Sequence, residues 1–216
     1  MKIKLVGKGK MGQIFKSLYN DEIVEHVDFG KDLSKEIIAD IVIDFSHHSN
    51  IDEIINHVKE LKIPLLIATT GHNEEEVRKI NNCSKIIPIC FDANYSKGIN
   101  MIKKVVDVFD CNFEKIIINE VHHKSKKDAP SGTALMLKKC IENKTKQNVN
   151  IEWVRKDDVF GIHKVVFQNI NEEIQITHIA KDRNIFAIGA HDASKRLIYK
   201  KPNLYNYSDL LEVEYE

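Results

Sequence analysis

The chain has 216 residues, of which 43% are hydrophobic and 30% are charged. These proportions are typical of one or two water-soluble domains and exclude a disordered or fibrous protein. Because 32 Lys and Arg residues balance 32 Asp and Glu residues, no net charge attracts nucleic acid or an anionic membrane surface. The longest apolar runs, at 63–68 and 86–91, are far shorter than the roughly 20 residues that cross a bilayer. We therefore expect a cytoplasmic protein with a small-molecule partner, without nucleic acid or a membrane.

Four cysteines are scattered along the chain without a C-x-x-C pair or the spacing of metal ligands. Buried thiols in a reducing compartment fit this pattern better than a disulfide framework or a structural zinc. The N-terminal segment also lacks the continuous apolar core of a secretory signal, so we expect the mature chain to begin at Met1. The cysteines are Cys83, Cys90, Cys111 and Cys140.

Short apolar runs alternate with amphipathic stretches in the first part of the chain. Continuous β-branched runs without polar alternation are typical of a parallel sheet that is buried on both faces. Two amphipathic stretches begin with capping patterns, Ser49 with Asp52 and Asn73 with Glu76. Strand, turn and helix in repetition predict a Rossmann-like, doubly wound α/β sheet, since parallel strands need crossovers of that length. The runs assigned to strands are 3–6, 23–29, 41–45, 64–69 and 86–90.

The pattern changes after about Ser96. Polar and apolar residues alternate over 165–180 in two strands joined by 169–172, which predicts an antiparallel hairpin with two unlike faces. An apolar run at 116–118 leads into a polar segment over 119–133. We therefore predict a second, α+β domain with a mixed or antiparallel sheet. Helices are expected over 99–109, where Phe109 closes one apolar face, over 132–142 and over 186–199.

A glycine-rich turn, G-K-G-K-M-G at 7–12, follows the first expected strand and opens a helix. Its three glycines permit a tight turn, close approach of a pyrophosphate to backbone N–H groups, and close packing of helix on strand. Asp28 stands at the end of the second strand, where a carboxylate can accept hydrogen bonds from an adenosine ribose. These features predict a dinucleotide site. Nearby Lys8, Lys10 and Lys31 leave the choice between NADH and NADPH open.

The segment 120–134 reads E-V-H-H-K-S-K-K-D-A-P-S-G-T-A. Pro130 and Ser131 fit a helix start, so the amides of Gly132 and Thr133 should face an anion, most simply a carboxylate. Two histidines and several lysines just upstream can supply a proton and a counter-charge. A metal site is a weaker interpretation, because adjacent side chains on a strand point to opposite faces and no acidic triad is spaced to complete a site.

This segment, E-x-H-H-x-x-K-x-D-A-P-S-G-T-A, resembles the signature of the 4-hydroxy-tetrahydrodipicolinate reductase family, formerly called dihydrodipicolinate reductase. The resemblance extends over almost the whole chain. It includes the glycine-rich turn at 7–12, D-F-S at 44–46, A-T-T-G at 68–71, A-N-Y-S-K-G-I-N at 93–100, I-T-H at 176–178, Arg183 and F-A-I-G-A at 186–190.

The resemblance implies an NADH- or NADPH-dependent oxidoreductase of the diaminopimelate route to lysine. It implies that His122 is the proton donor and Lys126 the second catalytic group. It further implies a homotetramer assembled through the sheets of the second domain, with a first domain of 1–96 and 191–216 and a second of 97–190. The implied substrate-binding residues are His123, Gly132 and Thr133. The implied cofactor-binding residues are Gly7, Lys8, Gly9, Lys10, Met11, Gly12, Asp28, Ala68, Thr69, Thr70, Asp92, Ala93, Asn94 and Tyr95.

Some positions depart from the family's pattern. Asp157 replaces a glycine, so if that glycine needs positive φ, the loop takes another path. Ile179 replaces an arginine, which removes a possible anion contact. The stretch before Trp153 is short, and His47 and His48, which stand where relatives often have Asn-Pro, are interpreted as loop residues.

Three other functions remain open from the residues. A non-catalytic NAD(P) sensor would need the glycine-rich turn and Asp28 but not His122 with Lys126. A metal-dependent hydrolase using His122 and His123 would need a third ligand, which the spacing does not reveal. A dehydrogenase of another amino or keto acid could share the fold, because fold does not determine substrate.

Overall fold

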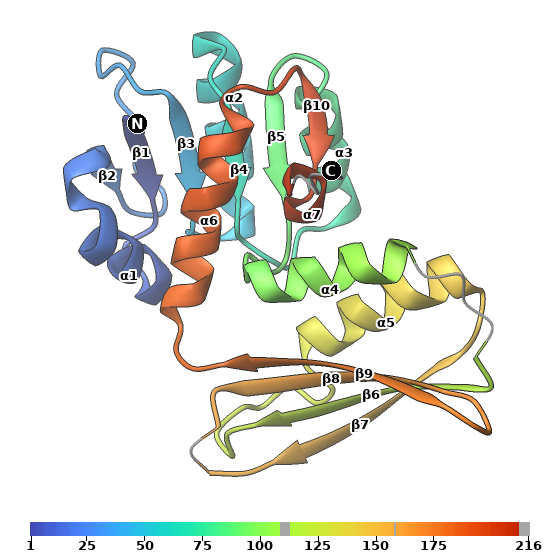
Figure 1. The fold of residues 1–216 in the computed structure, drawn as a ribbon. Coiled ribbons are helices and arrows are strands. Elements are labelled where there is room, and N and C mark those ends of the chain that lie inside the picture. The colour runs from blue at the N-terminus through green and yellow to red at the C-terminus, as the bar shows by residue number, and fades with distance from the viewer. Residues whose placement is uncertain (109–112, 158, 212–216) are drawn as a thin grey trace. The chain divides into compact units, whose positions relative to one another are not determined.

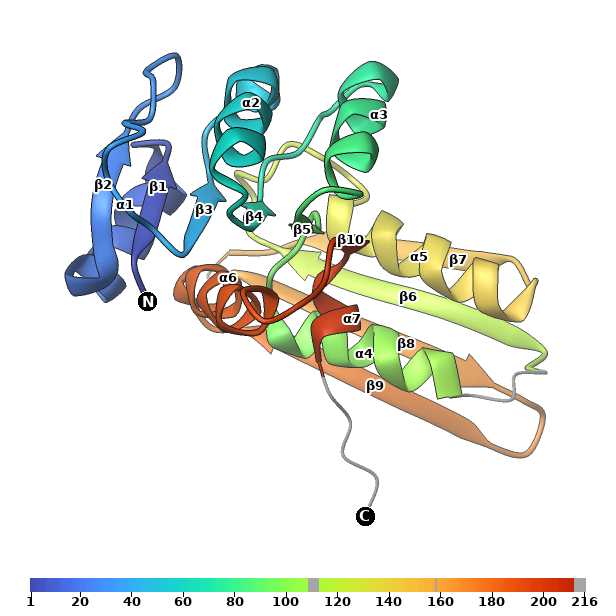
Figure 2. The ribbon, with the colours of Figure 1, turned by 90° about the horizontal axis from the view of Figure 1, so that it is seen from above.

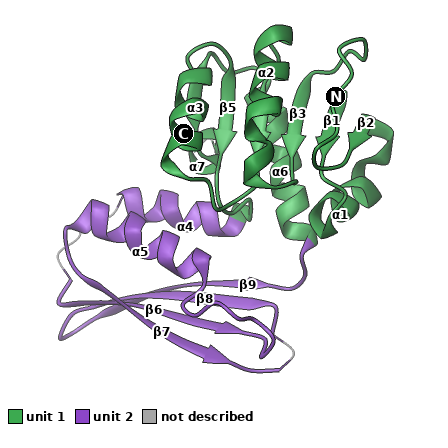
Figure 3. Ribbon diagram, turned by 180° about the vertical axis from the view of Figure 1, so that it is seen from behind, with its two compact units in different colours: residues 1–97, 184–216 green, residues 98–183 purple. Residues whose placement is uncertain are grey.

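The computed structural model describes residues 1–108, 113–157 and 159–211. Contacts divide the chain into two compact units, Met1–Lys97 with Asn184–Glu216, and Gly98–Arg183 (Figure 3). The chain returns to the first unit at Asn184, earlier than the expected 191. The physical reason is that a whole helix, beginning at this residue, packs into the core of the first unit.

The first unit contains a six-stranded parallel sheet (Figure 1). The strand order is β10-β5-β4-β3-β1-β2, so the chain winds in one direction from β1 to β2 and in the other from β3 onward. This confirms the predicted doubly wound sheet. The strands are β1 (Ile3–Val6), β2 (Ile23–Val27), β3 (Ile41–Asp44), β4 (Leu65–Ile67), β5 (Pro88–Phe91) and β10 (Asn203–Tyr205).

Helices cover both faces of this sheet (Figure 2). On one face, α1 (Lys10–Tyr19), α6 (Asn184–Leu197) and α7 (Tyr207–Leu210) pack in one apolar cluster. On the other face, α2 (Ile51–Leu61) and α3 (Glu74–Cys83) pack in a second cluster. Burial on both faces explains why the central strands are continuously apolar.

One of the two predicted helix caps is confirmed and the other is wrong. Asn73 and Glu76 form a capping box at the start of α3, with side-chain to backbone distances of 2.8 and 2.9 Å. Ser49 does not cap α2, because its backbone N–H donates to His47 Nδ1 at 3.3 Å in a short 3₁₀ turn, His48–Asn50. A second 3₁₀ turn, Asn20–Glu22, links α1 to β2.

The second unit has a four-stranded sheet in the order β7-β6-β8-β9, with two helices on one face (Figure 3). β6 and β7 are parallel and the other pairs are antiparallel, which confirms a mixed sheet and the predicted hairpin. β6 continues through His122, whereas the sequence suggested that it ends near Ile118. The elements are α4 (Lys97–Val108), β6 (Lys115–His122), α5 (Gly132–Thr145), β7 (Val149–Arg155), β8 (Gly161–Gln168) and β9 (Glu173–Ala180).

The second unit's core lies between its helices and its sheet. Ile99, Ile102 and Val106 of α4 are buried there, as the helical spacing predicts, together with residues of α5.

Phe109 and Cys111 lie outside the described residues. Cys83 and Cys90 are buried and Cys140 is partly buried. In the described ranges, no helix combines the length and the apolar character that crossing a membrane requires.

Candidate active site

The three glycines of the turn after β1 have three different roles. Gly7 adopts φ +103°, and a Cβ there would lie 2.7 Å from the backbone of Phe45, at the end of β3. A Cβ on Gly12 would lie 1.9 Å from the carbonyl oxygen of Gly7, so only glycine lets α1 pack this closely. A Cβ on Gly9 would meet nothing within 4 Å, so its backbone faces open space.

The start of α1 fits an anionic ligand. Gly9 is the N-cap and makes no side-chain capping bond, so it leaves the helix's first N–H groups without a capping side chain. Lys8 and Lys10 are exposed here, whereas Met11 packs partly against the core. The turn lies between β1 and β3, where the winding direction of the sheet reverses, which is the usual ligand position in such folds. The residues present therefore fit a dinucleotide pyrophosphate.

Asp28 follows β2 and lies beside this turn. Its Oδ1 accepts hydrogen bonds from the backbone N–H groups of Phe29 (2.9 Å) and Lys8 (3.2 Å). These two bonds lower the pKa of the exposed carboxyl, which stays ionised at neutral pH. A fixed carboxylate here suits the hydroxyl groups of a ribose.

The turn after β4 holds three more predicted cofactor residues. Thr69 is buried, and its hydroxyl lies 3.2 Å from Asp44 Oδ2 and 2.9 Å from His72 Nε2. Ala68 is partly buried and Thr70 is exposed. His48 Nδ1 lies 3.0 Å from Glu76, which ties the loop after β3 to α3.

The turn after β5 is fixed mainly by its own side chains. Asp92 accepts from the backbone N–H groups of Asn94 (3.2 Å) and Tyr207 (3.1 Å). The Tyr95 hydroxyl donates toward the carbonyl oxygens of Ile67 (2.9 Å) and Cys90 (3.1 Å) inside the core. The side chains of Asp92 and Tyr95 thus hold the turn in place, while Ala93 is exposed.

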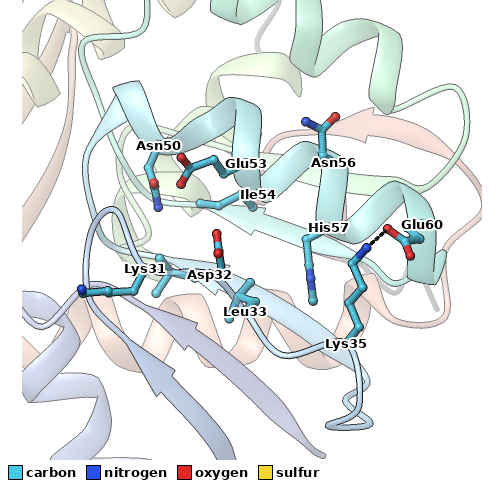
Figure 4. A pocket seen from close by; sticks show the side chains of 11 residues that line it. Lys31, Asp32, Leu33, Lys35, Asn50, Glu53, Ile54, Asn56, His57 and Glu60 are labelled. Carbon is cyan, nitrogen blue, oxygen red and sulfur yellow. Dashed lines mark ion pairs between the residues drawn. The ribbon is translucent and has the colours of Figure 1, made fainter.

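A cavity of about 340 Å³ lies between α2 and the loop that follows β2 (Figure 4). Its wall includes His57, whose Nε2 lies 3.1 Å from the ammonium of the fully buried Lys4. Burial and the neighbouring Lys4 lower the pKa of His57, so the neutral ring accepts from the ammonium. None of the predicted cofactor residues lines this cavity.

The second unit gathers an acid–base cluster on the helix-facing side of its sheet. Glu120 and His122 are two residues apart on β6 and are both buried, while His123 follows the strand and is only partly buried. Glu120 Oε1 accepts from the Ser131 backbone N–H (3.0 Å) and from Arg155 Nη2 (3.2 Å). His163 of β8 pairs with Glu120 across the sheet, and its Nε2 lies 3.7 Å from Glu120 Oε2.

The three buried groups of this cluster differ in how their surroundings shift their pKa values. Burial is the main cause that lowers the pKa of His122. The charge of Glu120 raises this pKa, whereas the charges of Lys126 and Arg155 lower it further. Burial lowers the pKa of His163 to about 4, so this ring is neutral at neutral pH. Burial alone would raise the pKa of Glu120, but hydrogen bonds from Ser131 and the nearby charges lower it, so the carboxyl is ionised.

Lys126 and the start of α5 are linked through Asp128. The ammonium of Lys126 lies 2.8 Å from Asp128 Oδ1, and Lys126 is the main cause that lowers the pKa of this carboxyl, with a smaller contribution from the Gly132 backbone N–H. Ser131 caps α5 by accepting from the Ala134 backbone N–H at 3.2 Å, which confirms the predicted helix start. An acidic side chain of the protein, Asp128, therefore lies near the predicted anion position before Gly132.

The residues missed by sequence reasoning are Glu120 and His163. Glu120, His122 and His163 each offer one potential metal-ligand atom, all within 4.8 Å of one another. This corrects the expectation that no acidic group completes such a set, although the Arg155 guanidinium beside Glu120 opposes a cation, and we assign no metal. The alternation of a strand, which places residues i and i+2 on one face, is the signal that could have found Glu120.

Two departures from the family's pattern have structural accounts. Asp157 does not adopt a positive φ, and its carboxylate pairs with Lys124 at 2.6 Å. Ile179 pairs with Ile162 across β8 and β9, one residue after His178, and therefore points to the sheet face opposite the cluster. Its side chain is exposed.

These features define a two-domain protein with a Rossmann-type first unit and a histidine–carboxylate cluster in its second. Two family descriptions match the chain, "Dihydrodipicolinate reductase, N-terminus" over residues 22–95 and "Dihydrodipicolinate reductase, C-terminus" over residues 98–211. The chain belongs to the dihydrodipicolinate reductase family.

Named relatives agree with this assignment. The chain is 38% identical to the 4-hydroxy-tetrahydrodipicolinate reductase of Caldanaerobacter subterraneus, over 94% of this chain and 95% of the relative. It is 36% identical to that of Clostridium tetani, over 98% and 97%. Its fold resembles the dipicolinate-bound dihydrodipicolinate reductase from Paenisporosarcina sp. TG-14, with a TM-score of 0.83 and 19% identity over 98% of this chain and all of that chain. It also resembles an amine dehydrogenase from Mycobacterium smegmatis, with a TM-score of 0.70 and 8% identity over 100% and 97%.

Proposed function

We propose that this protein reduces 4-hydroxy-tetrahydrodipicolinate to tetrahydrodipicolinate with NADH or NADPH, in the diaminopimelate route to lysine. The observation that carries the proposal is the position of His122, which is buried beside the ionised Glu120 and lies within the influence of the Lys126 charge. The chain that carries this histidine belongs to the reductase family. The lack of net charge and the absence of a long apolar run support a cytoplasmic protein without a nucleic acid partner.

The first unit would hold the cofactor. The glycine-rich turn and the N-terminus of α1 would bind the pyrophosphate, Asp28 the ribose, and the segments 68–70 and 92–95 the remainder. When bound, the nicotinamide supplies the hydride. No redox-active side chain is then required of the protein.

The second unit would hold the substrate and supply the proton. Loss of the 4-hydroxyl group as water leaves a conjugated C=N/C=C system in the substrate. Hydride addition to this system leaves negative charge that a proton must neutralise, and His122 can donate that proton. A substrate carboxylate would replace Asp128 at the Lys126 ammonium and the Gly132 N–H, with Thr133 and His123 as further donors. Asp128 thus keeps the Lys126 ammonium paired until a diacid binds.

The direct test follows the absorbance of NADH and NADPH when the protein is mixed with the freshly generated product of the preceding synthase. We expect the absorbance of at least one cofactor to fall in proportion to the substrate consumed. No oxidation of either cofactor would reject the proposed reaction, whereas binding without oxidation would favour a sensor.

Replacing Asp28 by Ala should weaken NADH binding more than NADPH binding. The carboxylate accepts from ribose hydroxyls but repels a 2′-phosphate, so its removal costs NADH a hydrogen-bond acceptor and relieves NADPH of a repulsion. Fluorescence titration of the wild type and the variant with both cofactors measures the two affinities. An equal loss for both would place the ribose contact on another residue.

Replacing Lys126 by Ala should lower kcat/KM by an amount equivalent to about 1.5–3 kcal/mol, the usual value of a charge-assisted hydrogen bond. Both KM and kcat should change, because the ammonium contacts the substrate and also acts on His122. The neighbouring Lys127, which is exposed, provides the matched control as Lys127→Ala. Kinetics of Lys126→Ala that equal those of the control would mean that the carboxylate pocket is misplaced.

We also propose a homotetramer assembled through the uncovered face of the β7-β6-β8-β9 sheet. In the described part of this unit, both helices pack on the other face. The uncovered face carries apolar side chains at Val154 and Ile179, both more than half exposed, which is typical of an association surface. Light scattering measures the mass, and Ile179→Asp should shift it toward smaller species. A wild-type monomer at micromolar concentration would reject this assembly.

A further inference from the structure

The buried carboxylate of Glu120 lies beside His122 and has no role in the reaction described so far. We propose that Glu120 is a positioning residue, which holds the His122 imidazole with Nδ1 toward the carboxylate and leaves Nε2 to exchange the proton with the substrate. This inference rests on the proposed reductase function. It adds to that function a residue that acts through His122 without contacting the substrate.

Two polar atoms without partners face each other in this pair. Glu120 Oε2 and His122 Nδ1 are 3.6 Å apart, and both are buried without a hydrogen-bond partner among the described residues. A buried ionised carboxylate is stable only when its oxygens are paired. Because Oε1 already accepts from Ser131 and Arg155, the Nδ1–H of His122 is the natural donor to Oε2 after a small approach.

The carboxylate itself is held in place from two sides. The Ser131 N–H belongs to the N-cap of α5, and Arg155 ends β7, where its Nη2 also donates to the Asp128 carbonyl oxygen at 2.6 Å. Glu120 has no exposed side-chain surface. Its orientation is therefore determined by a helix end and a neighbouring strand, so it can in turn orient the histidine.

The opposite edge of the imidazole is packed against β8. A Cβ on Gly161 would lie 3.0 Å from His122 Nε2 and 3.2 Å from Cδ2, so a larger residue at this position would press on this edge of the ring. The ring is thus placed between Glu120 on its Nδ1 side and the backbone of Gly161 on its Nε2 side. Because Nδ1 is directed at Glu120, Nε2 is the nitrogen that is left for proton exchange.

The charges around His122 act in opposite directions. Arg155 from β7 and Lys126 from the loop before α5 disfavour the imidazolium, whereas Glu120 and Asp128 favour it. His163 from β8, with ring centroids 5.0 Å away, is neutral near pH 7, and His178 of β9 faces His163. Glu120 is the larger of the two acidic contributions, and it is the one buried with the ring.

The first test measures the tautomer of His122 in the wild-type, ligand-free protein. Long-range ¹H–¹⁵N correlation spectra distinguish the two neutral forms, and His122→Gln assigns the signal. We expect the neutral ring to carry its proton on Nδ1. A neutral ring with its proton on Nε2 would overturn the proposal, and this test does not depend on any Glu120 variant being folded.

The second test replaces Glu120 by Gln. The amide keeps the shape but offers Nδ1 a donor instead of an acceptor, so the neutral proton should move to Nε2 and the imidazolium should lose its counter-charge. We expect kcat at neutral pH to fall by at least about tenfold. The limb of the kcat/KM profile that falls with rising pH should move about one unit lower, as is usual when a neighbouring opposite charge is removed. The matched control is Glu114→Gln, an exposed residue just before β6.

The outcomes separate this proposal from the reductase function. An unchanged pH profile and an unchanged tautomer in Glu120→Gln would overturn the positioning role, even if the enzyme reduces its substrate. If the wild type oxidises neither cofactor, the reductase function fails, yet the tautomer measurement still decides whether Glu120 orients His122. A lower yield of folded Glu120→Gln without any change in tautomer would mean that the carboxylate only supports the fold.

Discussion

Replacing His122 by Gln should lower kcat by about 10² to 10⁴, the usual contribution of a positioned acid. NADH affinity should stay nearly unchanged, because the predicted cofactor residues belong to the first unit and His122 to the second. Steady-state kinetics and a fluorescence titration with NADH measure the two effects. Turnover close to that of the wild type would show that another group protonates the substrate.

The adjacent His123→Gln provides the comparison for that variant. His123 is not on the buried face, and its Nδ1 lies 2.7 Å from the Ser125 hydroxyl. Because His123 is a proposed substrate contact, His123→Gln should raise KM more than it lowers kcat. His122→Gln should instead mainly lower kcat. If the protein is only an NAD(P) sensor, the wild type, His122→Gln and His123→Gln should bind NADH equally well, and none of them should reduce the substrate.

Replacing Gly12 by Ala should destabilise the ligand-free protein by about 1–3 kcal/mol or more, as is usual when a methyl group is forced into a packed site. The new Cβ would lie 1.9 Å from the Gly7 carbonyl oxygen, so α1 must move away from β1. Thermal unfolding followed by circular dichroism should show a melting temperature lower by about 2–4 °C per kcal/mol for a chain of this size.

Gly9→Ala tests how closely the cofactor approaches the turn, without disturbing the packing of α1 on β1. Gly9 has φ −69°, and a Cβ would meet nothing within 4 Å, so the melting temperature should not change. The added methyl group should nevertheless weaken NADH, since it occupies the space that a pyrophosphate needs. Unaltered NADH affinity would show that the phosphates do not approach Gly9, and an unaltered melting temperature of Gly12→Ala would contradict the packing argument.

Local sequence signals were sufficient to predict most of the strands and helices of the first unit. The central strands are recognised because a parallel sheet covered on both faces needs continuous apolar runs. The Asn73–Glu76 box is recognised because both of its hydrogen bonds are local. β10 was missed, since three residues are too few to show a period. Ser49 was misassigned because a nearby imidazole, His47, competes for its backbone N–H.

The sequence by itself determined the nucleotide-binding class of the first unit, the hairpin of the second and the reactive segment 120–134. Each of these depends on residues that are neighbours in the chain, so periodicity and spacing report them. Only the tertiary structure decided that Glu120 meets Arg155 and His163, because these contacts depend on the register of β6 against β7 and β8. It also decided that Asp128 pairs with Lys126 near Gly132, since the path of the loop between β6 and α5 brings that carboxylate close to the helix end.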